Sequence, residues 1–295
     1  MTLPAINVQS GYESLGWGAQ GHTSAGTAAG NSYTLSSNGT TLYANAKALP
    51  APPGYCATNG VSNTNCMQTM ATSDCPSAGK TVTDARDGKT YTIKLINGQC
   101  WMTQNLRFTG TSVPSATSNV TADKTLTYYS LKDNASSSSA KCYGTSSSGN
   151  GYSNACIQDS GSTSTGVWYN YYAATAGTVS GTSNSTAASQ DICPKNWHLP
   201  SGSYESGTDF TKLVGNTNGS AQAPTAGLTA FGAVAGGLYY NGSLGNTGYG
   251  SWWSATSGNG TLRWFLQYNS SANTFNTGSL YDRYIGMFVR CVRSS

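Results

Sequence analysis

Charge is the scarcest property of this sequence. Only 9% of its 295 residues are charged, and it contains only two histidines. Acid–base catalysis and metal binding depend mainly on carboxylates, imidazoles and thiolates, so the chain offers few residues for either. The 15 lysines and arginines are scattered rather than gathered in a run, and the formal net charge is +4. We therefore expect no nucleic-acid partner, because such surfaces carry dense basic patches.

A long apolar run is also missing. No stretch approaches the ~20 apolar residues that cross a bilayer, so no membrane span is expected. The first seven residues, Met1 to Asn7, have neither the basic start nor the apolar core of an export signal. We interpret Met1 as an added start, with the natural export signal removed.

Small polar residues and aromatic residues are abundant in this sequence, whereas charged residues are few. Abundant glycine, serine, threonine and asparagine fit either a disordered chain or a loop-rich extracellular β protein. Disordered segments have few aromatic residues and a high net charge, whereas this chain has 19 tyrosines and 7 tryptophans. Because large rings bury enough area to order a chain that is poor in leucine and isoleucine, the composition favours the β protein.

The eight cysteines predict disulfides rather than a metal site. None stands in a Cys-x-x-Cys pair, whereas structural zinc needs paired ligands at short spacing. Disulfides form in oxidising compartments, so we expect an extracellular or cell-surface protein. Eight cysteines allow ~105 pairings, and sequence alone does not select one. The pairing that we favour is Cys56–Cys66, Cys75–Cys100, Cys142–Cys156 and Cys193–Cys291.

The chain divides into a small β unit over residues 1–48, a linker over 49–54 and a large domain over 55–295. The first unit has two β-prone runs, 33–35 and 41–44, around an Asn-Gly turn signal. With the preceding Gly16-Trp17-Gly18 it resembles the end of the Listeria–Bacteroides (internalin B-type) surface repeat, although Ala46 replaces the final tryptophan; a generic hairpin is the alternative. The linker contains three prolines, which favour extended chain.

The first half of the large domain begins with dense strand signals. Residues 81–102 predict a β-meander with strands at 81–83, 90–96 and 100–102, separated by an Asp-Gly and an Asn-Gly turn. A Ser/Thr/Gly-rich insertion follows over about 110–190, with a buried-looking aromatic island at 167–172.

The second half begins with an expected helix over 203–214. Ser203 or Ser206 would cap it, and its apolar face would contain Tyr204, Phe210, Leu213 and Val214. After residue 227 strands are expected again, at 238–240, 252–253, 262–268 and 287–292.

Five ordered blocks resemble one family. They are Thr83–Tyr91 (TDARDGKTY), Gln99–Leu106 (QCWMTQNL), Ile192–Ser201 (ICPKNWHLPS), Trp252–Thr256 (WWSAT) and Gly286–Val292 (GMFVRCV). In order and spacing they are similar to the Fibrobacter succinogenes major paralogous domain, over roughly residues 75–293. That family is exported, and many members are surface lipoproteins or adhesin-like proteins.

This family in turn resembles the C-type lectin superfamily, in the branch of formylglycine-generating enzymes and retroelement-diversified variable proteins. His198–Ser201 is similar to the Arg-Leu-Pro-Thr motif that opens a helix in that branch, and Val289–Val292 is similar to its closing strand. The resemblance implies an α+β fold, a C-type-lectin-like domain with small antiparallel sheets, few helices and long loops.

We do not expect an enzyme. A nucleophile needs a base and an orienting group nearby, and His198, the only histidine of the large domain, lies in a block where the resemblance implies a structural role. Formylglycine-generating enzymes use reactive cysteines, whereas Cys193 and Cys291 stand in structural blocks. The chain also lacks the Glu-Pro-Asn and Gln-Pro-Asp triplets of calcium-dependent lectins, so we expect no metal, no cofactor and no calcium-dependent sugar site.

Binding is the favoured function. Alternation along 263–269 would direct Trp264, Leu266 and Tyr268 into the core and the intervening residues to solvent. An exposed Phe265 would mark a contact surface, unless it covers a loop. The segment between 239 and 284 also has the Tyr, Asn, Gly and Ser mixture of a paratope. The predicted ligand-binding residues are Tyr239, Asn241, Tyr249, Trp252, Arg263, Phe265, Gln267, Asn269, Tyr281, Asp282 and Tyr284.

These features predict a surface binding or adhesion protein that recognises a protein or glycan on another cell. The Tyr/Asn-rich segment precedes a Val-Arg-Cys-Val ending, which resembles the variable region of retroelement-diversified proteins, where adenine-directed mutation changes Asn and Tyr codons. Two alternatives remain open, a structural surface or fibre component and an enzyme of the formylglycine-generating type.

Overall fold

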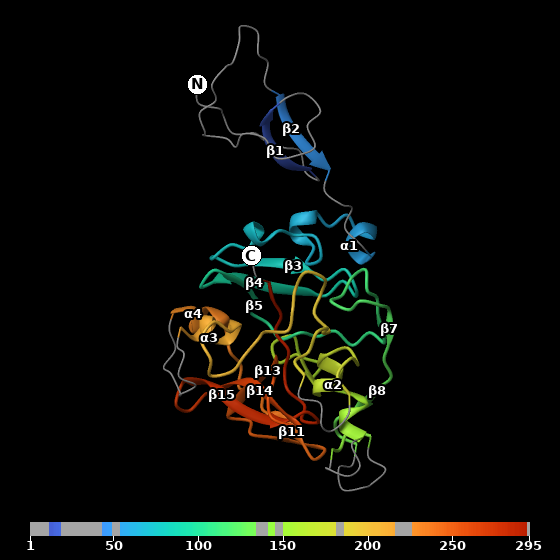
Figure 1. Ribbon diagram of the computed structural model, residues 1–295, viewed down its shortest axis with the longest axis vertical. Helices are drawn as coiled ribbons and strands as arrows, with labels where there is room; N and C mark the ends of the chain where they lie inside the picture. Colours follow the sequence, from blue (N-terminus) through green and yellow to red (C-terminus); the bar gives the residue numbers. More distant parts are fainter. Residues whose placement is uncertain are drawn as a thin grey trace.

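The computed structural model describes residues 12–18, 43–48, 54–133, 141–144, 150–180, 186–215 and 226–293. Within these residues the fold is mixed, with several small and mostly antiparallel sheets and a few short helices (Figure 1). This agrees with the α+β class expected from the sequence. No helix in the described segments has both the length and the apolar character that a membrane span needs.

The N-terminal unit contains an antiparallel pair, β1 (Tyr12–Gly18) and β2 (Tyr43–Ala48), which Figure 1 shows apart from the other elements. The second predicted run, 41–44, overlaps β2. The other predicted run, the Asn-Gly turn and linker residues 49–53 lie outside the described residues.

The predicted meander is confirmed as β3 (Lys80–Thr83), β4 (Thr90–Ile96) and β5 (Gln99–Met102). Asn97 and Gly98, with φ of 49° and 80°, form the two-residue turn between β4 and β5, because such turns need left-handed backbone at both positions. The last strand, β16 (Val292–Arg293), adds to β5, so the sheet order is β16-β5-β4-β3. Ahead of this sheet lie three short helices, α1 (Gly54–Thr58), η1 (Asn63–Asn65) and η2 (Thr72–Asp74).

All eight cysteines are paired, and the pairing is the favoured one. The disulfides are Cys56–Cys66, Cys75–Cys100, Cys142–Cys156 and Cys193–Cys291. The first three close short segments, whereas the last joins residues 98 positions apart. Such a set fits an extracellular protein.

The Ser/Thr/Gly-rich insertion contains secondary structure of its own. Its elements are β6 (Ser112–Val113), β7 (Lys124–Thr125), β8 (Tyr128–Ser130), η3 (Asn150–Tyr152), β9 (Ala155–Asp159), β10 (Val167–Tyr169) and α2 (Tyr171–Ala174). The aromatic island is buried as predicted, with Trp168 at 4% and Tyr169 at 0% exposure. Asn170 begins α2, because its side chain accepts a hydrogen bond from the backbone N–H of Ala173.

The predicted helix over 203–214 is shorter than expected. α3 spans Asp209–Val214 and is capped by Thr208, not by Ser203 or Ser206. Gly207, at φ +85°, has left-handed backbone that interrupts a helix. Tyr204 therefore lies before the helix and is exposed rather than part of its apolar face. A further helix, α4 (Ala226–Phe231), was not predicted.

The C-terminal part forms a hairpin and a three-stranded sheet. The hairpin is β11 (Leu238–Tyr240) and β12 (Ser243–Gly245); the sheet is β13 (Tyr249–Ser257), β14 (Leu262–Asn269) and β15 (Thr274–Asp282) in that order. The sequence missed β15, whose Asn, Thr, Gly and Ser residues give a weak strand signal. The strand expected at 287–292 is mostly a buried extended segment with isolated bridges, from which only β16 emerges as a strand.

Arg290 lies at the centre of the core and joins these parts. Its side chain is 1% exposed. Its Nε donates to Oδ1 of Asn105 at 2.8 Å, and Nη2 donates to the carbonyl of Gly232 at 2.8 Å. Its guanidinium also stacks on Phe231 at 4.2 Å. Burial lowers the pKa of Arg290 to about 9, so the group still carries its charge at neutral pH.

Candidate functional site

The predicted ligand-binding residues do not share one surface. Trp252, Arg263 and Phe265 are at most 2% exposed, which corrects the expected solvent-facing side of β14. Arg263 lies over the ring of Tyr171 at 5.1 Å, and Phe265 contacts Tyr281 with ring centroids 6.2 Å apart. Both faces of the sheet are covered here, so none of these three side chains is accessible to a ligand.

The sequence assigned the faces of β14 wrongly because both faces are covered at the middle of the strand. Phe265 pairs with Trp253 and Leu266 pairs with Trp252, and neighbouring strand residues face opposite sides. The two pairs pack in separate core clusters, so all four side chains are buried. Trp264, expected in the core, is instead partly exposed.

Tyr249, Gln267 and Asn269 form a separate, half-buried group at the far end of β13 and β14. Tyr249 pairs with Asn269 across the two strands. The Asn269 side-chain oxygen accepts hydrogen bonds from the backbone N–H groups of Ser271 and Ala272, at 3.0 and 3.1 Å. Asn269 therefore shapes the turn into β15.

Five tyrosines lie together near the end of β11 and the end of β15. We call this group the tyrosine cluster. Its members are Tyr143, Tyr152, Tyr240, Tyr281 and Tyr284. The ring of Tyr284 contacts those of Tyr143, Tyr152 and Tyr240, with centroids 5.8, 5.9 and 6.0 Å apart. Tyr281 joins through Tyr240, at 6.2 Å.

Separate parts of the chain position these rings. Tyr240 ends β11 at a two-residue turn, where Asn241 and Gly242 have φ of 50° and 73°, and this left-handed geometry is that of a tight hairpin. Gly151, next to Tyr152, packs so closely that a Cβ there would lie 2.5 Å from the Cβ of Tyr284. The Cys142–Cys156 disulfide holds the segments of Tyr143 and Tyr152 together.

Asp282 supplies the negative charge beside the cluster. Its Oδ1 accepts hydrogen bonds from the Thr261 hydroxyl at 2.6 Å and the Tyr152 hydroxyl at 3.2 Å. Burial, and then the Asp282 charge, raise the pKa of Tyr152 to about 12. Burial also raises the pKa values of Tyr281 and Tyr284. These three tyrosines therefore stay neutral at physiological pH and can donate and accept hydrogen bonds, which suits binding better than proton transfer.

Exposure distinguishes a buried supporting residue of the cluster from an exposed contact residue. Tyr284 is 8% exposed, whereas Tyr240 is 41% exposed. The sequence selected Tyr239 instead, which is 7% exposed and packs on Trp168 with centroids 5.2 Å apart. Neighbouring strand residues face opposite sides, but nothing local indicates which of two adjacent tyrosines faces out.

Backbone conformation explains part of the asparagine content. Within the part of the chain that the structure describes, five asparagines adopt positive φ between 49° and 69°, namely Asn97, Asn196, Asn241, Asn246 and Asn273. Asparagine tolerates this conformation better than other residues that have a side chain, apart from aspartate. Asn241 is exposed as predicted, and its place in the hairpin turn accounts for it without a ligand.

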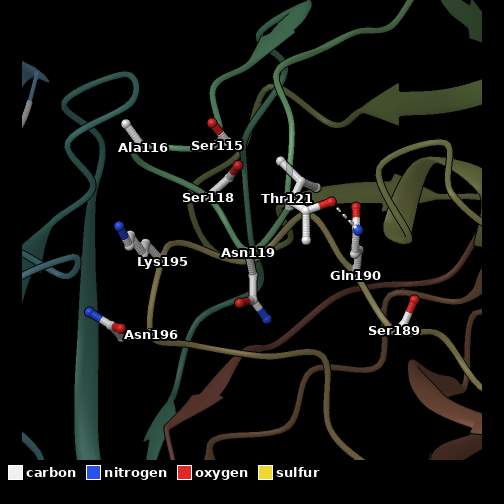
Figure 2. Close-up of a pocket in the computed structure, with 10 residues that line it drawn as sticks. Ser115, Ala116, Ser118, Asn119, Thr121, Ser189, Gln190, Lys195 and Asn196 are labelled. Atoms are coloured by element: carbon white, nitrogen blue, oxygen red, sulfur yellow. Dashed lines mark hydrogen bonds between the residues drawn. The ribbon is translucent and has the colours of Figure 1, made fainter.

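A polar recess of about 490 Å³ lies elsewhere, between residues 115–121 and 189–196 (Figure 2). Its lining is hydroxyl and amide groups with one cation, Lys195. Many of these groups are already paired. Gln190 bonds to the Thr121 hydroxyl, as Figure 2 shows, and Asn119 bonds to Asp191 at 3.2 Å. The recess has no aromatic platform, so it offers a ligand less than the tyrosine cluster does.

His198 lies near a serine and an aspartate, but the order of contacts does not form a catalytic triad. Its Nε2 lies 3.2 Å from Oδ2 of Asp209, and the Ser201 hydroxyl donates to that same oxygen at 2.8 Å. A triad needs the serine on the histidine. This group instead fixes the start of α3. No set of three His, Cys, Asp or Glu residues within the described ranges could hold a metal ion.

Comparison with known proteins gives no relative. No protein-family model, curated protein or solved structure matches the chain.

Proposed function

We propose that this chain is an extracellular binding protein that holds a protein or glycan of another cell against the tyrosine cluster. The observation that carries the proposal is the arrangement of the cluster itself. Tyr240, 41% exposed, stands on the nearly buried ring of Tyr284. A rigid aromatic residue with a polar tip loses little conformational entropy on binding, which is why such residues dominate recognition surfaces.

The C-type-lectin-like fold is part of this proposal. Two features support it besides the sequence blocks. The His198–Ser201 segment leads into the capped helix α3 through Asp209. The last strand, β16, pairs with β5 near the start of the domain. Retroelement diversification is a further expectation, and it predicts a near-identical template repeat downstream of the gene that differs only at adenines.

Cell binding tests the proposal. Fluorescently labelled protein would be added to Gram-negative bacteria, Gram-positive bacteria and epithelial cells, each untreated, protease-treated or periodate-oxidised. We expect binding to at least one cell type and a loss of about tenfold or more in affinity with Tyr240→Ala. Tyr55→Ala is the matched control, because Tyr55 is 44% exposed in α1, outside the cluster.

The treatments identify the ligand class. Loss of binding after protease indicates a protein ligand, and loss after periodate indicates a glycan. Failure to bind any cell, or binding that Tyr240→Ala leaves unchanged, contradicts the proposal. Self-assembly of the wild type without cell binding would instead favour the fibre component, and an alkylatable Cys193 or Cys291 would favour the enzyme.

A further inference from the structure

A second aromatic group lies at the surface beside the C-terminal sheet. Tyr204, before α3, and Trp264, on β14, line a pocket of about 350 Å³ together with Leu280 of β15 and the turn at 256–259. We propose that this pocket binds a pyranose ring of a saccharide, without a metal ion. The site goes beyond the tyrosine cluster and does not depend on it.

One aromatic wall is exposed and the other partly exposed, and their planes are steeply inclined to each other. Tyr204 is 54% exposed, more than any other large hydrophobic side chain of the described residues. Its ring meets that of Trp264 edge to face, with centroids 5.3 Å apart and planes at 77°. Trp264 pairs with Leu280 across β14 and β15, which extends the apolar floor. An exposed aromatic pair of this kind is costly to leave in water unless it has a ligand.

Polar groups surround this floor. The Glu205 carboxylate and the Asn259 amide are both exposed at the pocket and form no hydrogen bond with the described residues. The backbone beneath them is fixed, because Ser203 Oγ accepts the N–H of Glu205 at 3.0 Å and Thr256 Oγ1 accepts the N–H of Gly202 at 2.9 Å. These bonds restrain the backbone at the rim of the pocket, and the two side chains are left to bind a ligand.

This combination matches a saccharide. One face of a pyranose carries C–H groups with partial positive charge, which are attracted to the negative face of an aromatic ring. Its rim carries hydroxyl groups, which a carboxylate and an amide bind from the side. The pocket volume lies within the range of small-ligand sites. Glu205 is the only charged residue in the lining, so an anionic ligand would be repelled.

A quaternary ammonium ion is the main competitor, since aromatic cages with a carboxylate bind such cations. A cage surrounds its cation with separated rings. Here the two rings touch each other edge to face, which leaves a corner rather than a gap. The geometry therefore favours a flat ligand that lies against one ring.

Saturation-transfer-difference NMR tests the assignment. The probes are the methyl pyranosides of glucose, galactose, mannose and N-acetylglucosamine, each with EDTA present. We expect saturation transfer to the ring C–H protons of at least one sugar, and a reduction of about tenfold or more with Tyr204→Ala. Because Tyr204 is so exposed, that variant should keep the wild-type unfolding midpoint. Trp264→Phe should keep part of the signal.

Two control variants show whether sugar binding depends on this pocket. Tyr55→Ala and Tyr240→Ala should leave sugar binding unchanged, and the latter separates this pocket from the tyrosine cluster. No transfer to any of the four sugars, or transfer that persists in Tyr204→Ala, overturns the proposal. So does saturation transfer to tetramethylammonium that Glu205→Gln abolishes while the sugars give none, which would assign the pocket to a cation.

Discussion

Two stretches of the chain are held together by different means. Between residues 56 and 156 three disulfides close short segments. Between 194 and 290 there is no cysteine at all, although the Tyr204–Trp264 pocket and most of the tyrosine cluster lie there. In that stretch packing takes over, through Trp252, Trp253 and Arg290, which are all at most 1% exposed. The candidate binding residues of that stretch thus depend on the core beneath them, whereas the Cys142–Cys156 disulfide holds Tyr143 and Tyr152 of the tyrosine cluster.

The largest expected effect comes from the one disulfide that connects the ends of this cysteine-free stretch. Replacing Cys193 and Cys291 together by alanine opens a loop of 98 residues, and chain entropy predicts a loss of about 4.7 kcal/mol. The matched pair Cys142→Ala with Cys156→Ala opens a loop of only 14 residues and should cost about 3 kcal/mol. Urea unfolding measures both, and equal losses would contradict the loop-length argument.

Trp252→Ala should cost about 3–5 kcal/mol, because the cavity cannot close. The indole donates to Asn105 at 2.7 Å and packs on Phe231 with ring centroids 5.4 Å apart. Trp264→Ala, at a partly exposed position of β14, is the matched control and should cost about 1 kcal/mol or less. If both variants unfold at the same urea concentration, packing does not distinguish the buried from the partly exposed part of the sheet.

Acid should weaken the junction between the two stretches at Asp209, whose carboxylate accepts a hydrogen bond from the side-chain amide of Gln99. Burial alone would raise the pKa of Asp209, but hydrogen bonds from His198 and Ser201 outweigh it and lower the pKa to about 2. A carboxyl whose folded-state pKa is depressed contributes stability above its unfolded pKa, near 3.8, and that contribution is lost as the pH falls toward 2. Asp209→Asn should be less stable at pH 7 by about 2 kcal/mol.

Between pH 5 and pH 2 the same variant should lose less stability than the wild type. At pH 2 the free energies of unfolding of the two proteins should differ by no more than about 1 kcal/mol. Unfolding at a series of pH values measures the difference, with Asp133→Asn, at an exposed turn, as the control. Parallel curves for wild type and Asp209→Asn would show that other carboxyls cause the acid sensitivity.

The smallest effect concerns the turn beside the tyrosine cluster. Asn241 has φ of 50°, so Asn241→Ala should cost about 1 kcal/mol through backbone strain, while Asn241→Gly should be nearly neutral. Both would be measured by urea unfolding and by cell binding. Binding that Asn241→Gly lowers at unchanged stability would show that the amide itself contacts the ligand.

Local signals account for what was predictable. The Asn97-Gly98 turn and the alternating strands around it predicted the first sheet, because a two-residue turn fixes the pairing register. Short cysteine separations favoured the local disulfides Cys56–Cys66 and Cys142–Cys156. The C-terminal sheet was predicted less well, since the burial of both faces of β14 and the choice between Tyr239 and Tyr240 depend on packing partners far away in sequence. Tyr204 was misplaced because Gly207 was not recognised as a helix stop.

The pairing of β16 with β5 has a consequence for how the protein is displayed. It places the exit of the large domain, at Arg293, beside the sheet nearest its start, at the end of the domain toward β1 and β2 (Figure 1). The hairpin β11–β12 and strand β15 lie at the opposite end in the same view. A tether that follows β16 would therefore leave the hairpin of Tyr240 at the end of the domain away from the attachment.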